Sequence, residues 1–276
     1  GGAATMSGDP PNIIIGTALG LSFGDFLRNT GVIVLVGMVV MVPYFYFCFR
    51  KQVQSWDPQA RQKVMELDPR DSIHNRGQFA IHVILFLVVV VLLITHAQTG
   101  LTVATVGIIA AILTLLVNRW PLHLLRRVDW KTVLFFIGLF LAVSGLEQTG
   151  ILDGLARFLG NLGGEDTGRM MVVLIWFTAL LSAFVDNIPM ATVMVPVLTA
   201  LSDGLGMDLE TLTWSVSKGT DIGGIATPIG ASANVTGVML AAREGHPISW
   251  RRYCKYAVPL SLLVLVLSMV LLLAFH

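Results

Sequence analysis

Three polar segments, two of them rich in glycine, interrupt the apolar parts of this sequence, and they hold the residues that could bind a small ion. They are residues 1–12, residues 182–192 around Asp186 and Asn187, and residues 221–234. Glycine lets the backbone approach a ligand closely, and the free N–H groups at the start of a helix attract an anion. Hydroxyl, amide and carbonyl oxygens coordinate small cations. These residue types therefore indicate a binding site for a cation, an anion or both.

The composition places these segments in a membrane protein. Of 276 residues, 55% are hydrophobic and 13% are charged, whereas a soluble domain carries about 25% charged residues. This argues against a soluble enzyme, a nucleic-acid-binding protein and a disordered chain, and a net charge of +1 indicates no acidic partner. Cys48 and Cys254 are too far apart in sequence to form a metal or redox motif. We predict an all-α polytopic membrane protein that is not an enzyme.

Five apolar stretches are long enough to form membrane-spanning helices, which need about 20 residues each. They are residues 30–49, 79–95, 101–118, 132–146 and 256–275. These helices must position the polar segments, because hydrocarbon cannot satisfy the backbone groups that proline and glycine leave free.

Two further apolar stretches are interrupted at their centres. Residues 170–201 carry Asp186, Asn187 and a proline at their middle, which favours a re-entrant hairpin over two ordinary helices joined by a tight turn. Residues 213–243 contain Asp221 and several glycines, which predicts a broken helix.

The basic residues gather in alternate loops and so indicate sidedness. If residues 50–78 form a cytoplasmic loop, fourteen of the eighteen Lys and Arg residues lie on the cytoplasmic side. A re-entrant hairpin and a double crossing give the same result, so the charges do not choose between them. We interpret residues 50–78 as a linker between two halves.

The glycine-rich segment occurs twice. Residues 1–12 and 223–234 are identical at six of twelve positions, at a constant offset of 222. Each copy is followed by a short amphipathic joint, at residues 21–29 and 247–255, and then by one span. The predicted sidedness gives these two spans opposite directions, which is typical of the inverted repeats of secondary transporters. A chance match between glycine-rich segments is the alternative.

The candidate binding residues are the glycines and the oxygen-bearing side chains of these segments. A carboxylate at mid-membrane costs about 2.5–3.5 kcal/mol, which favours an ion ligand or proton carrier at Asp186 over a turn cap. Both interpretations stay open for Asp9, and for Asp221 an ion pair with Lys218 is favoured over a coupling-ion role. The full set is Gly1, Gly2, Thr5, Ser7, Asp9, Asn12, Ser182, Asp186, Asn187, Thr192, Asp221, Gly223, Gly224, Thr227, Ser232 and Asn234, with Asn187, Thr227 and Asn234 as candidate Na⁺ ligands.

Together these motifs resemble the ion transporter superfamily, and most closely its ArsB/NhaD-type permeases, which include arsenite permeases, citrate transporter-like proteins and P proteins. The resemblance rests on residues 1–13, 182–189 and 223–234, and residues 145–150 also resemble the family pattern. It covers essentially the whole chain. It implies two inverted repeats, each with three scaffold helices, a re-entrant hairpin, a broken helix and a final helix. It also implies homodimers in which a transport domain moves like an elevator.

On this resemblance the chain is expected to be a C-terminal fragment in which the first repeat is truncated. Residues 1–49 would be half of a broken helix and the last helix of that repeat, followed by the linker at residues 50–78. The complete second repeat, residues 79–276, would hold scaffold helices at 79–146, a hairpin at 170–201, a broken helix at 213–243 and a last helix at 256–275.

The expected function is secondary active transport of a small anion or a neutral oxyacid such as arsenite, coupled to Na⁺ or H⁺, with no other cofactor. One alternative is a Na⁺/H⁺ antiporter with Asp9 and Asp186 as titrating carriers. A remote alternative is an intramembrane aspartyl hydrolase that uses the same two residues, but its Gly-x-Gly-Asp context is missing. The expected location is a prokaryotic plasma membrane, and the substrate stays open among carboxylates, oxyanions and cations.

Overall fold

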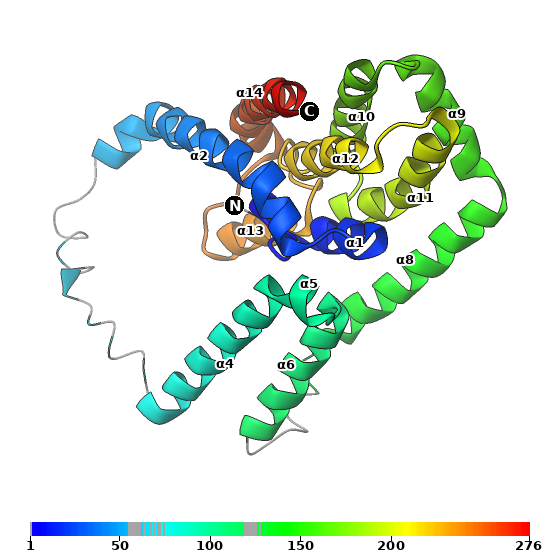
Figure 1. Ribbon diagram of the computed structural model, residues 1–276. Coiled ribbons are helices and arrows are strands. Elements are labelled where there is room, and N and C mark those ends of the chain that lie inside the picture. The colour runs from blue at the N-terminus through cyan, green and yellow to red at the C-terminus, as the bar shows by residue number, and fades with distance from the viewer. Residues whose placement is uncertain are drawn as a thin grey trace. The chain divides into compact units, whose positions relative to one another are not determined.

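The computed structural model describes residues 2–54, 62, 65, 66, 68, 70, 73, 75–118, 126 and 128–276. These residues form helices, and no strand occurs among them, which confirms the all-α prediction (Figure 1). The elements are η1 (Gly2–Ala4), α1 (Pro10–Leu19), α2 (Phe23–Gln54), α4 (Arg76–Ile94), α5 (His96–Thr99), α6 (Val103–Val117), α8 (Trp130–Gln148), α9 (Ile151–Gly163), α10 (Thr167–Ser182), α11 (Asn187–Leu205), α12 (Leu209–Gly223), α13 (Ser232–Arg243) and α14 (Trp250–Phe275). Much of the predicted linker at residues 50–78 lies outside the described residues.

The chain divides into two compact units. One unit comprises Gly1–Met41 and Trp130–His276, and the other comprises Val42–Asp129. In the second unit α4 packs against α6, and a polar contact of 3.4 Å joins Asn118 Nδ2 to His82 Nε2. The described candidate binding residues all belong to the first unit.

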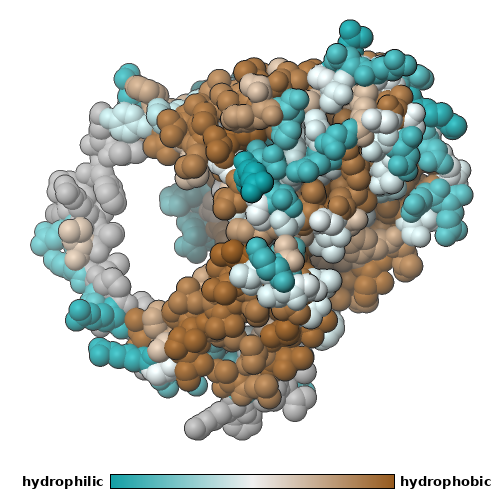
Figure 2. All heavy atoms as spheres, viewed as in Figure 1, coloured by the Kyte–Doolittle hydropathy of each residue, from teal (hydrophilic) through white to brown (hydrophobic). Residues whose placement is uncertain are grey.

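Among the described residues, α2, α4, α8, α11 and α14 are long and apolar enough to cross a membrane. Helices α6 and α10 are apolar but shorter, at 15 and 16 residues. Large side chains on these helices face outward: Val39, Phe86 and Leu141 are 71%, 66% and 69% exposed. Figure 2 shows broad hydrophobic areas on the surface. Apolar surface on this scale suits lipid rather than water, so the chain is a polytopic membrane protein.

The span helices begin earlier than predicted. The amphipathic joints expected at residues 21–29 and 247–255 are mostly continuous with α2 and α14, which begin at Phe23 and Trp250. Capping residues explain this. Asp25 Oδ2 accepts from Ser22 N at 2.8 Å while Ser22 Oγ accepts from Asp25 N at 3.2 Å, and Ser249 Oγ accepts from Arg252 N at 3.3 Å. These bonds satisfy free N–H groups and mark the helix starts.

Helices α10 and α11 are joined by only four residues, 183–186. Asp166 Oδ1 caps α10 by accepting from Arg169 N at 2.6 Å. Asp186 Oδ1 caps α11 by accepting from Ile188 N at 3.1 Å. The turn therefore falls at the position indicated by the sequence, while its re-entrant course stays a prediction.

Helix α12 is enclosed by its neighbours. Every residue from Thr211 to Gly223 is buried, and α1, α10, α11 and α14 pack around the helix. A Cβ atom added to Gly223 would lie 2.3 Å from Ala179 O of α10, so this packing needs a residue without a side chain. The chain leaves α12 after Gly223 and forms α13 from Ser232, at the interruption that the sequence indicates.

Asp208 caps the exposed start of α12. Its Oδ2 accepts from the backbone N–H of Thr211 at 2.7 Å and from Thr211 Oγ1 at 2.8 Å. Both bonds hold the pKa of Asp208 below its ordinary value, and the bond from the backbone N–H of Thr211 contributes most. A carboxylate with a depressed folded-state pKa stabilises the fold above its unfolded pKa of about 3.9, and this contribution is lost as the pH falls through the folded-state value.

We expect Asp208→Ala to lower the free energy of unfolding by about 1 kcal/mol at neutral pH, because the α12 cap is lost. The measurement is denaturant unfolding of the full-length protein in detergent. The difference from wild type should shrink once the pH falls below about 4. Asp203→Ala, at an exposed aspartate near the end of α11, is the matched control with little expected effect. Equal losses in the two variants would contradict the capping role.

Candidate functional site

The two copies of the repeated segment have the same backbone geometry where their helices begin. Asp9, which precedes α1, has φ −144° and ψ 142°, and Ala231, which precedes α13, has φ −148° and ψ 144°. Asn12 N donates to Asp9 O at 3.1 Å, and Asn234 N donates to Ala231 O at 3.0 Å. The sequence repeat is therefore also a local structural repeat.

The repeated glycines are needed where each loop folds onto itself. A Cβ atom on Gly8 would lie 2.3 Å from Gly2 O, and one on Gly230 would lie 2.6 Å from Gly224 O. Both distances are too short for a side chain, so Gly8 and Gly230, which occupy the same position in the two copies, must lack one. The result in each copy is a helix start whose N–H groups lie beside a tight loop.

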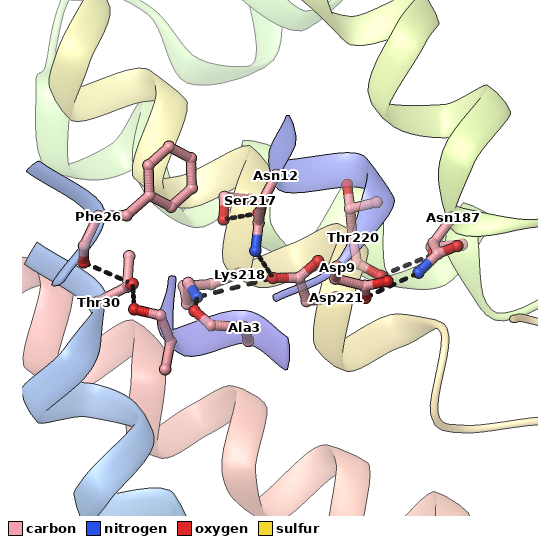
Figure 3. Close-up of polar contacts among 12 residues, drawn as sticks. Ala3, Asp9, Asn12, Phe26, Thr30, Asn187, Ser217, Lys218, Thr220 and Asp221 are labelled. Atoms are coloured by element: carbon pink, nitrogen blue, oxygen red, sulfur yellow. Dashed lines mark hydrogen bonds and ion pairs between the residues drawn. The ribbon is translucent and has the colours of Figure 1, made fainter. Parts of the chain in front are cut away.

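A buried polar cluster lies between α1 and α12 (Figure 3). Asn12 of the first copy contributes its side chain from α1, and Ser217, Lys218 and Asp221 contribute theirs from α12. Asn12 Nδ2 donates to Asp221 Oδ2 at 3.0 Å, and Ser217 Oγ donates to Asn12 Oδ1 at 2.8 Å. Lys218 Nζ lies 3.7 Å from Asp221 Oδ2 and donates to Ala3 O. The predicted ion pair between Lys218 and Asp221 is therefore confirmed.

The start of α11 lies between the two repeated loops. Asn187 Nδ2 donates to Asp9 Oδ2 at 3.3 Å in the first copy, and Asn187 N donates to Gly230 O at 3.2 Å in the second. Ser182 Oγ, at the end of α10, donates to Thr220 O at 2.8 Å. The turn between α10 and α11, residues 183–186, is called the hairpin tip, and the residues at its two ends contact both interrupted segments.

Side chains of the second copy hold their own loop in place. Asn234 Nδ2 donates to Gly224 O at 2.8 Å and to Thr227 O at 3.0 Å, and Thr227 Oγ1 donates to Ala183 O at the hairpin tip. These bonds occupy donor atoms, and Na⁺ binding by Asn187, Thr227 and Asn234 stays a prediction.

The remaining predicted residues lie around this cluster. Thr192 is buried and Thr192 Oγ1 donates to Ile188 O of its own helix at 2.9 Å. Ser7 is half-buried and Ser232 is exposed. The Thr5 hydroxyl lies against Gly8, where a Cβ atom would be 2.9 Å from Thr5 Oγ1. Gly1 lies outside the described residues.

Sequence reasoning missed Ser217 and the backbone carbonyl of Ala3. Ser217 lies one helical turn before Asp221 on a buried helix, and that spacing could have drawn attention to it. The bond from Lys218 to Ala3 O had no such signal, because backbone carbonyls carry no residue-specific pattern.

A large cavity lies elsewhere in this unit, away from the predicted binding residues. The cavity, of about 590 Å³, is lined by residues of α9 and α11 that include Asp153 and Arg157, and it contains none of the predicted binding residues. Within the part of the chain that the structure describes, no three His, Cys, Asp or Glu residues are grouped so as to hold a metal ion. The candidate site is the polar cluster where α1, α11 and α12 meet, because the contacts of Asn12, Asp9 and Asn187 bring predicted binding residues together there.

Buried polar groups at the interrupted helices of a polytopic helical protein are typical of membrane transporters. Comparison with known proteins supports this class and identifies the family. The family model described as Citrate transporter matches residues 1–219. The chain belongs to this family, which confirms the resemblance to the ion transporter superfamily, and it is an integral membrane protein.

Several curated relatives are similar along nearly the whole chain. An uncharacterized transporter of Mycobacterium tuberculosis is 33% identical to this chain. The similarity covers 98% of this chain and 63% of the relative. A 46 kDa membrane protein of Mycobacterium leprae is 32% identical, with 97% and 63% covered. The P protein of Sus scrofa is 27% identical, with 83% of this chain and 28% of that protein covered. The chain thus spans 63% of the length of the two mycobacterial relatives.

Proposed function

We propose that the full-length protein is a secondary active transporter of a small carboxylate-like anion or oxyacid, coupled to Na⁺ or H⁺. The observation that carries this proposal is the position of Asn187 between two equivalent loops. Its side chain contacts Asp9 at 3.3 Å and its backbone contacts Gly230 O at 3.2 Å. A hairpin tip held by two interrupted helices suits a site that opens to alternate sides.

An anionic substrate suits the helix starts at this position. The N-termini of α1, α11 and α13 follow the polar loops, and helix N-termini attract negative charge through their free N–H groups and dipole. Citrate is the first substrate to test, because the family description names citrate. Arsenite is the second, since a neutral oxyacid can use the same hydrogen-bond donors.

The proposal includes a transmembrane architecture, which the two copies of the repeated segment suggest. We place α10 and α11 as a re-entrant hairpin, and we relate the two copies as inverted repeats with elevator-like movement in a homodimer. The cytoplasmic placement of residues 50–78 is supported by the distribution of Lys and Arg. Bacterial relatives support a prokaryotic plasma membrane as the location.

A Na⁺/H⁺ antiporter is the second candidate, and the contact of Asp9 with Asn187 favours it. Asp9 is half-buried and belongs to a polar cluster, as a titrating carrier would. Asp186, the other proposed carrier, already accepts a bond from Ile188 N as a helix cap. Antiport would therefore depend mainly on Asp9.

The test is uptake by the full-length protein in proteoliposomes. Radiolabelled citrate and arsenite are each supplied with an inward Na⁺ gradient, with an inward proton gradient or with neither. We expect uptake of one solute to need one of the two gradients. Absence of uptake for both citrate and arsenite, together with Na⁺-driven proton release seen by a pH-sensitive dye, would overturn the anion proposal in favour of antiport.

A further inference from the structure

Asp221 has a buried carboxylate oxygen with no partner. The residue is 6% exposed, and its Oδ2 accepts from Asn12. Its Oδ1 has no hydrogen-bond partner among the described residues, and neither has Oγ1 of the preceding residue, Thr220, which is fully buried. Buried polar atoms almost always have a partner. Two such oxygens on adjacent residues of α12 therefore indicate a bound ligand that carries positive charge or donates protons.

The charges around Asp221 do not balance. Asp9 lies beside Asp221 in Figure 3, and Lys218 Nζ lies 3.7 Å from Asp221 Oδ2. Asp9 and Asp221 bring two negative charges against the single positive charge of Lys218, and Asp186 at the hairpin tip adds another. Asp221 and Lys218 are buried whereas Asp9 and Asp186 are half-buried, and an uncompensated charge costs more free energy the less water reaches it. One monovalent cation would neutralise the group of Asp9, Asp221 and Lys218.

The contacts of Asn12 and Lys218 leave one carboxylate oxygen of Asp221 unused. In Figure 3 Asp221 lies between Lys218 and Asp9, and Asn187 lies beyond Asp9. The Oδ2 of Asp221 faces Asn12 and Lys218, since both contacts use this atom. Carboxylate and hydroxyl oxygens are the ligands that hard cations prefer. A neighbouring ammonium group disfavours a divalent ion, so the chemistry suits Na⁺ better than Ca²⁺ or Mg²⁺.

We propose that Asp9 and Asp221 form a binding site for one monovalent cation of the Na⁺ type, completed by the hydroxyl of Thr220. Lys218 is its fixed counter-charge. The inference rests on the proposed transport function and names the place of its coupling ion. It puts that ion at the contact of α1 with α12, instead of at Thr227 and Asn234.

The test measures Na⁺ binding without any transported substrate. Full-length protein in detergent is titrated with NaCl against choline chloride at constant ionic strength, and both thermal stability and bound radioactive sodium are recorded. We expect saturable stabilisation and binding in the wild type. Asp221→Asn and Thr220→Val should weaken the apparent affinity for Na⁺ about 10-fold or more, because loss of even a residue that only supports a metal ligand usually costs about 10- to 100-fold. Asp153→Asn, at an exposed aspartate of α9, is the matched control and should bind Na⁺ like the wild type.

The outcomes separate this site from the transport proposal. Equal responses to Na⁺ and choline in the wild type would overturn the cation site, as would unchanged Na⁺ binding in both Asp221→Asn and Thr220→Val. The second variant keeps every charge, so a folding defect in the first does not decide the result. If Na⁺ binds as expected but no solute is taken up into proteoliposomes, the cation site stands and the transport function fails. If solute is taken up but Na⁺ does not bind, the cation site fails and the transport function stands.

Discussion

Replacing Lys218 by methionine is expected to abolish gradient-driven uptake and to lower the stability of the full-length protein by about 3–5 kcal/mol, the usual effect of breaking a buried ion pair. Lys218 is fully buried, lies 3.7 Å from Asp221 Oδ2 and donates to Ala3 O. Methionine fills a similar volume but leaves the Asp221 charge without its partner. Denaturant unfolding in detergent and uptake into proteoliposomes measure the two effects.

The double variant Lys218→Met with Asp221→Asn separates charge from shape. It removes both charges, so we expect stability to return most of the way to the wild-type value while uptake stays lost. Lys51→Met removes an exposed positive charge from α2 and is the matched control, with unchanged uptake and stability. A Lys218→Met protein that unfolds and transports like the wild type would show that the ion pair has no role.

Gly223→Ala is expected to prevent the close packing of α10 and α12. The added Cβ atom would lie 2.3 Å from Ala179 O and 2.5 Å from Ala179 Cα, and backbone atoms cannot move aside without moving the helix. Overpacking of this kind costs about 1–3 kcal/mol and more where the backbone must shift. Separation of the helices would also disturb the 2.8 Å bond from Ser182 Oγ to Thr220 O. We therefore expect loss of both thermal stability and uptake.

Gly237→Ala is the control for this steric effect. A Cβ atom on Gly237 of α13 would have no heavy atom within 4 Å, so alanine should be tolerated or should stabilise the helix slightly. The comparison uses thermal unfolding of full-length protein in detergent. Similar melting temperatures for Gly223→Ala and the wild type would mean that α10 and α12 are not packed as closely as described.

Local features of the site could be predicted because short-range chemistry determines them. The turn before Asn187 follows from its polar residues and proline, and the ion pair of Lys218 and Asp221 follows from their spacing on one helix. At Asp186 the bond from Ile188 N corresponds to a turn cap, which is the alternative interpretation of this residue from the sequence. Its role in ion binding stays a prediction.

The contacts that assemble the cluster could not be predicted from one sequence. Asn12 and Asp221 are 209 residues apart, and Asp9 and Asn187 are 178 residues apart. Which polar groups meet depends on how α1 packs against α12 and α11, and many pairings satisfy the same composition. A glycine such as Gly223 allows another helix to approach closely, but the sequence does not show which helix that is.

The contact of Asn187 with both loops is the basis of the proposed function, and uptake by Asn187→Ser tests it most directly. The variant keeps the backbone bond to Gly230 O and removes the amide that donates to Asp9 Oδ2. Asn161→Ser, at an exposed position of α9, is the matched control. With full-length variants of equal thermal stability, we expect gradient-driven uptake to fall to background in Asn187→Ser and to remain at the wild-type rate in Asn161→Ser. Uptake at the wild-type rate by Asn187→Ser would contradict the proposed site.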